Sequence, residues 1–157
     1  MDLPSTVVPA RAPSRRRGQV IAGIAVALSL GFLATACTSS EENSAISMLN
    51  TTRRAGFRAD LSSNVSLTLT AQSWSAQLAK NGRLSHRASL SVGAPAGWRK
   101  LGENVGYGGS VTVIHNAFVA SAPHLANIMD SAFNHLGIGV TVDGNGRRWE
   151  VQEFAGL

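Results

Sequence analysis

The chain has one cysteine, Cys37, among its 157 residues. A chain with a single cysteine cannot close an internal disulfide, so the core must stabilise any folded domain. Two hydrolase signatures are also missing: there is no His-Glu-x-x-His zinc motif and no Gly-x-Ser-x-Gly nucleophile motif. These absences argue against a zincin-type metalloenzyme and against a serine hydrolase.

Charge is sparse and unevenly placed. The formal net charge is +5, and residues 1–36, with four arginines and one aspartate, carry +3 of it, which leaves +2 for residues 37–157. That larger part shows no cluster of Lys or Arg interleaved with aromatic residues, which is the usual footprint of a nucleic-acid interface. Nucleic acid is therefore not an expected partner.

The first 36 residues have the layout of a secretory signal. Arg15–Arg17 precede an uncharged, mostly apolar run from Gln19 to Ala36, which stops at Cys37. Residues 34–37, Ala-Thr-Ala-Cys, resemble a bacterial lipobox, in which the cysteine is lipidated and becomes the new N-terminus. We predict that residues 1–36 are a lipoprotein-type signal peptide and that Cys37 is lipidated.

An uncleaved membrane anchor is the alternative, because the apolar run is close to the ~17–25 residues of a spanning helix. Either interpretation places the rest of the chain outside the cytoplasm and tethers it to a membrane; without the anchor it would be secreted. Residues 37–43 then form a polar linker. Residues 44–157 are long enough for one domain with its own core.

Helix signals dominate the first part of this domain. Asn43 or Ser44 can begin a helix that stops at Gly56, and Ser66 can begin a second one that ends at Gly82. The second helix carries apolar residues on one face, at i, i+4, i+7 and i+11: Leu67, Ala71, Trp74 and Leu78. Ser110 can begin a third helix through residue 120, and Ser121 a short fourth one.

Strand signals close the chain. Residues 136–142 and 148–154 alternate well enough for two strands, and residues 143–146, Asp-Gly-Asn-Gly, suit the turn of an antiparallel hairpin. Residues 87–109 are rich in Gly and Ser and are expected to be irregular, apart from brief pairing of residues 101–105 at a sheet edge. Helices followed by a hairpin predict an α+β layered domain.

Four blocks in a fixed order carry a family resemblance. They are Leu84-Ser85-His86, Gly102-Glu103-Asn104-Val105, the run Ser121–Ile128 and the run Phe133–Val140. Together they resemble the bacterial branch of the CAP superfamily, also called the SCP domain, over roughly residues 45–154. The resemblance implies an α-β-α sandwich of the CAP/SCP type.

The resemblance also implies a site. Matched block by block, His86, Glu103 and His124 would line one cavity and hold a divalent metal such as Zn²⁺, for which imidazole and carboxylate are suitable ligands. Asn127, one helical turn after His124, could orient that imidazole or contact a ligand. The second acidic residue of many eukaryotic members has no counterpart in residues 117–121.

Each of these residues also has a purely structural interpretation. His86 follows a helix end and could bond a terminal carbonyl, while Glu103 could fix nearby backbone by accepting N–H bonds. His124 lies near the start of its helix, so it could serve in capping or packing. Sequence spacing leaves these alternatives open, because the three residues come from separate segments.

Three functions follow from different classes of protein. The first is a cell-envelope binding module that uses the cavity for a divalent metal, a small lipid or a cell-wall component. The second is a metal-assisted hydrolase, with Glu103 as general base and a metal at His86 and His124 activating water. The third is an interaction protein whose surface, and not its cleft, does the work.

Overall fold

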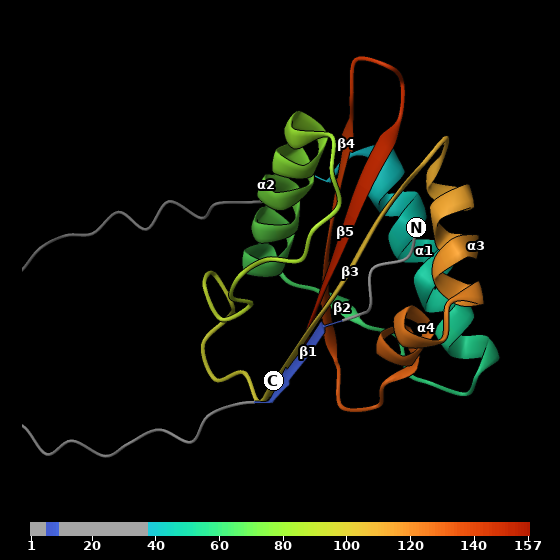
Figure 1. The fold of residues 1–157 in the computed structure, drawn as a ribbon. Coiled ribbons are helices and arrows are strands. Elements are labelled where there is room, and N and C mark those ends of the chain that lie inside the picture. Colours follow the sequence, from blue (N-terminus) through green and yellow to red (C-terminus); the bar gives the residue numbers. More distant parts are fainter. Residues whose placement is uncertain (1–5, 10–37) are drawn as a thin grey trace, which may run out of the picture.

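The domain is a three-layer sandwich with one mixed sheet in the middle (Figure 1). A computed structural model describes residues 6–9 and 38–157. Helix α2 (Val65–Asn81) covers one face of the sheet, and α1 (Ser40–Ala55), α3 (Val111–Ala120) and α4 (Ala122–Met129) cover the other. The predicted α-β-α architecture is confirmed.

The sheet has the strand order β1-β3-β5-β4-β2. Its strands are β1 (Thr6–Pro9), β2 (Ser62–Ser63), β3 (Lys100–Gly108), β4 (His135–Val142) and β5 (Arg148–Gly156). Strands β4 and β5 pair antiparallel, as the predicted hairpin requires, and β2 pairs parallel to β4. Strand β1 falls inside the predicted signal peptide, while Cys37 and the apolar run lie outside the described residues.

Strand β3 is the main correction to the sequence analysis. The segment expected to be irregular contains a nine-residue strand that pairs with β5 along its whole length, from Lys100↔Gly156 to Gly108↔Arg148. Three of its nine residues are glycines, which weaken the strand signal. Pairing with β5 along the whole strand supplies the order that its composition does not.

The helices begin earlier than their expected caps. Ser39 caps α1 in a capping box with Glu42, and Asn64 caps α2 by accepting a hydrogen bond from the Leu67 N–H. Gly82 ends α2 in the left-handed region at φ 63°, where a residue without Cβ meets no steric penalty. Ser110 caps α3, as predicted.

The core is divided between the two faces of the sheet, and within the described residues its members lie between Ala45 and Leu157. The predicted α2 stripe is buried except for Trp74, which is half-buried and donates its indole N–H to the Ser85 carbonyl at 3.0 Å. At Gly137 and Gly139 of β4, a Cβ would come within 2.2 Å of the α2 backbone. These two glycines therefore let helix and strand touch.

Within the described ranges, 6–9 and 38–157, no helix is both long enough and apolar enough to cross a membrane.

Candidate functional site

Two glutamates lie side by side in the centre of the sheet, on the α2 side. Glu103 of β3 and Glu153 of β5 are directly opposite each other in the register, with exposures of 0% and 2%. Side chains alternate along a strand, and Leu101 and Val105 on either side of Glu103 pack into the clusters beneath α2. Both carboxyl groups are thus buried under that helix and the loop that follows it.

That loop supplies their partners. His86 Nδ1 lies 2.6 Å from Glu103 Oε1, and the backbone N–H of Arg87 donates to the same oxygen at 3.1 Å. The Arg87 guanidinium donates to Glu153 Oε1 at 2.8 Å. One histidine and one arginine, adjacent in sequence, therefore each engage one of the two acids.

Burial raises the pKa of Glu153 to about 8, and repulsion from Glu103 adds to the effect, while Arg87 opposes it. Glu153 therefore holds its proton at neutral pH. A protonated Glu153 carboxyl group can serve as a donor, and Glu103 Oε2 on the neighbouring strand is buried with no hydrogen-bond partner among the described residues. Arg87 supplies a positive charge beside this buried pair.

Amide side chains occupy the opposite face at the same level of the sheet. Asn104 donates to Gln152 Oε1 at 3.0 Å and to the His124 carbonyl at 3.2 Å. Asn127 donates to Asn104 Oδ1 at 3.0 Å and to the Glu103 carbonyl at 3.2 Å. These bonds fix both halves of α4, through His124 and Asn127, to the middle of β3.

Gln152 extends this network to another buried acid. Its amide donates to Glu150 Oε1 at 2.8 Å, and Glu150 Oε2 has no hydrogen-bond partner among the described residues. Glu150 is fully buried, and this desolvation raises its pKa to about 7. The network thus ends in a carboxyl group whose proton is held near neutral pH.

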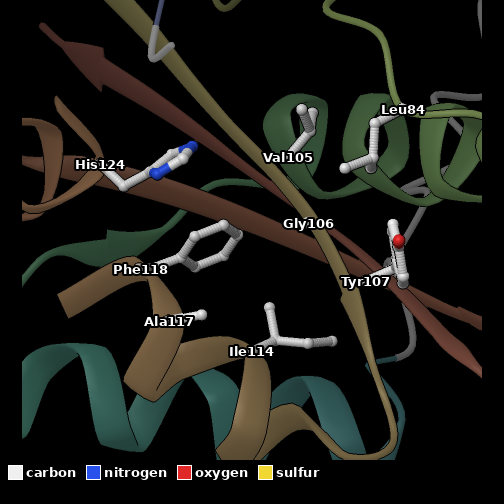
Figure 2. Close-up of a pocket in the computed structure, with 8 residues that line it drawn as sticks. All are labelled: Leu84, Val105, Gly106, Tyr107, Ile114, Ala117, Phe118 and His124. Carbon is white, nitrogen blue, oxygen red and sulfur yellow. The ribbon is translucent and has the colours of Figure 1, made fainter. Parts of the chain in front are cut away.

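His124 projects from the first turn of α4 toward a pocket. Its Nδ1 lies 2.8 Å from the Ser121 hydroxyl, which makes no cap bond to the helix, and its ring packs on Phe118 with centroids 4.9 Å apart. Figure 2 shows the imidazole beside the Phe118 ring, next to β3. The sequence analysis expected Ser121 to cap α4, and the histidine takes its hydroxyl instead.

The pocket has a volume of about 190 Å³ and lies along β3 (Figure 2). Mostly apolar side chains from both faces of the sheet form its walls, and His124 and Tyr107 supply polar groups. The lining residues are Leu84, Val105, Gly106, Tyr107, Ile114, Ala117, Phe118 and His124. A small cavity with mostly apolar side chains, one imidazole and one phenol is suited to a short apolar group that carries a polar end.

The structure therefore brings some of the predicted site residues into contact. His86 and Glu103 are in direct contact, and Asn127 is bonded to the Glu103 backbone. His124 is tied to the same strand through Asn104. Within the described residues, no three His, Cys, Asp or Glu side chains are grouped so as to hold a metal ion, and binding of a divalent metal stays a prediction.

The sequence analysis missed Glu153 and Arg87, and also the amide network. The available signal was the polar content of the predicted last strand, where Glu150, Gln152 and Glu153 stand among apolar residues. Three buried polar residues in one central strand require partners on both faces of the sheet. That pattern alone could not name the partners.

Comparison with known proteins agrees with this architecture. The solved structures that match include an outer surface protein of Borrelia burgdorferi, at 14% identity and a TM-score of 0.69, which covers 76% of this chain and 95% of that one. An extracellular protein with an SCP domain from Bacillus anthracis matches at 19% identity and a TM-score of 0.66, over 74% of this chain. This chain spans only 40% of that protein.

A venom allergen-like protein of Schistosoma mansoni shares the fold at 11% identity and a TM-score of 0.62, over 75% of this chain and 89% of that one. A search of curated proteins found no match. The profile of the cysteine-rich secretory protein family, CAP, matches residues 46–154, which is more than half of the sequence. With the sandwich and its His86–Glu103 contact in place, the chain belongs to the CAP family.

Proposed function

We propose that this protein is an extracytoplasmic CAP-domain binding module, tethered to the cell membrane through Cys37, whose pocket beside His124 takes a small ligand. The pocket is the observation that carries the proposal. Its walls combine the apolar side chains of Leu84, Ile114 and Phe118 with one buried imidazole. Such a site favours a short apolar group with a polar or anionic end.

Location outside the cytoplasm rests on two arguments. Arg15–Arg17, the apolar run and Cys37 form a lipoprotein-type leader. The matching proteins from Borrelia and Bacillus are described as an outer surface protein and an extracellular protein. Membrane fractionation of cells that express the natural chain or Cys37→Ser tests the tether: only the natural chain should stay with the membrane.

The hydrogen bonds of Glu103 and the raised pKa of Glu153 favour a binding function over hydrolysis. A general base needs a carboxylate free to accept a proton from water. Glu103 Oε1 already accepts from the Arg87 N–H and contacts His86, and Glu153 is itself protonated at neutral pH. Glu103 Oε2 is buried and has no hydrogen-bond partner among the described residues, and the groups around Glu103 and Glu153 are arranged for recognition.

Hexanoate is a suitable probe, because it joins a short alkyl chain to one carboxylate. Titration of residues 38–157, which contain the whole described core, should give saturable amide NMR shifts at Val105, Gly106 and Phe118. Ala117→Trp fills the pocket from an exposed position and should abolish these shifts. Ala120→Trp, an exposed residue of the same helix outside the lining, should not. Absence of saturable shifts in the natural sequence would refute the proposal.

A divalent metal is the second candidate ligand. The direct contact of His86 with Glu103 favours it, since imidazole and carboxylate are adjacent there. Calorimetric titration with Zn²⁺ should then show binding that is lost in a His86→Ala/His124→Ala double variant. Equal heats for the two proteins, both folded, would reject the metal.

A further inference from the structure

Strand β3 has one edge that is only partly paired. Its other edge pairs with β5 from Lys100 to Gly108, whereas β1 covers this edge only from Lys100 to Glu103. From Val105 to Gly108, no strand in the described part of the chain lies on it. An open strand edge presents backbone N–H and C=O groups that an added strand can pair with.

The pocket is located on this open stretch. Val105, Gly106 and Tyr107 of β3 are in its lining, between Leu84 on one side and Phe118 on the other. Figure 2 shows these walls on both sides of the strand. A chain laid along the edge would therefore pass the mouth of the cavity.

Gly106 determines which part of such a chain would enter the cavity. A Cβ on Gly106 would lie 2.8 Å from the Phe118 ring and 3.2 Å from Ile114 Cγ2, so this position faces α3. Directly opposite residues in an antiparallel pair project to the same face. The residue opposite Gly106 would hence direct its side chain toward Phe118 and His124, with no β3 side chain in the way.

The size of the cavity fits this role. A volume of about 190 Å³ suits a single apolar side chain and is too small for the two acyl chains of a phospholipid. Strand β1 already shows what this edge accepts: the segment Thr-Val-Val-Pro, rich in β-branched residues, pairs antiparallel with Thr6 opposite Glu103.

We propose that the β3 edge binds an extended, β-branched segment of a partner polypeptide as an antiparallel strand, with one apolar side chain opposite Gly106 in the pocket. The inference rests on the proposed binding function of that pocket and names its ligand class. Strand β1 is the example of such a segment within the chain. Cleavage before Cys37 would remove β1 and lengthen the open edge to the whole of β3.

A synthetic peptide of residues 1–10 is the probe, added to residues 38–157. The β1 register, continued along the peptide, would bring Leu3 opposite Gly106. We expect saturable binding with amide NMR shifts from Leu101 to Gly108. Leu3→Asp in the peptide, or Ala117→Trp in the domain, should weaken binding at least tenfold. A peptide N-methylated at Val7 and Val8 should also bind at least tenfold more weakly, because it loses ladder donors.

Other outcomes overturn the inference in distinguishable ways. If hexanoate binds and the peptide does not, the pocket functions without strand addition and only the inference fails. If neither binds, the proposed function fails too. If neither Leu3→Asp nor Ala117→Trp weakens peptide binding, the pocket takes no part in binding the peptide and the inference is wrong. A dimer of the domain that excess peptide cannot dissociate would assign the edge to a second copy of the chain.

Discussion

Glu150 and Glu153 are three residues apart on β5 and face opposite sides of the sheet, which makes them a natural pair to compare. Both are buried, and burial raises the pKa of both. Glu153 shares its face with a cation, Arg87, and a second acid, Glu103, whereas among the described residues Glu150 is bonded only to the amide of Gln152. On the α2 face, the positive charge of Arg87 thus stabilises the buried acid. On the other face, the buried acid has a neutral amide as its partner.

The largest expected effect comes from removing the cation of the α2 face. Arg87→Met leaves the Glu103–Glu153 pair buried without the positive charge beside it, and should lower the free energy of unfolding by about 3–5 kcal/mol. The loss should grow above pH 8, where Glu153 would ionise. Urea denaturation at pH 6 and pH 9 measures it.

A matched control is Arg54→Met, which breaks an ion pair with Asp60 whose side chains are 55% and 50% exposed. That change should cost less than about 1 kcal/mol. Equal losses for Arg87→Met and Arg54→Met would show that the positive charge of Arg87 does not stabilise the buried acid.

The next effect concerns the acid of the other face. Because the pKa of Glu150 is about 7 in the folded protein, against 4.5 ordinarily, the folded state keeps a proton that the unfolded chain loses. Its contribution to stability is therefore complete below pH 4.5 and is lost as the pH rises through 7. Glu150→Gln stays neutral, so it should be more stable than the natural protein by about 3 kcal/mol at pH 8.

The two proteins should have the same stability at pH 4, where Glu150 is protonated in both states. Thermal denaturation between pH 4 and pH 8 gives both comparisons. A constant difference across this range would contradict the raised pKa.

The smallest effect tests the amide network. Asn104→Ala removes partners from Gln152, Asn127 and the His124 carbonyl, and should cost about 1–3 kcal/mol. It should also weaken hexanoate binding, since α4 loses its link to β3. Thr51→Ala, which removes an exposed hydroxyl that donates to the Ser47 carbonyl and accepts from Arg54, should change stability by no more than about 0.5 kcal/mol.

Local patterns predicted the parts of the fold that depend on neighbours in sequence. The α2 stripe and the hairpin turn after Val142 were found because helix periodicity and turn glycines act over a few residues. Strand β3 was predicted only as brief edge pairing of residues 101–105, because its partner, β5, lies far along the chain and supplies the order that three glycines remove. The α+β class did not depend on that strand.

In the site, too, contacts between distant segments could not be predicted from local sequence patterns. The resemblance named His86 and Glu103, which the structure places in contact, yet Arg87 and Glu153 are 66 residues apart and no spacing rule links them. Glu103 and Asn104 are adjacent in one motif, but strand alternation sends their side chains to opposite faces. Adjacent residues of the motif at residues 102–105 therefore belong to two separate networks, the buried acid pair on one face of the sheet and the amide network on the other.

The close approach of α2 to Gly137 and Gly139 also has a consequence for motion. Backbone held against backbone leaves no side-chain layer that could repack, so α2 cannot slide over β4 without opening the sheet. The α2 layer should then exchange its amide hydrogens only through global unfolding. Any breathing that admits a ligand to the pocket is left to α3 and α4, which approach β3 through side chains such as Phe118 and Asn127.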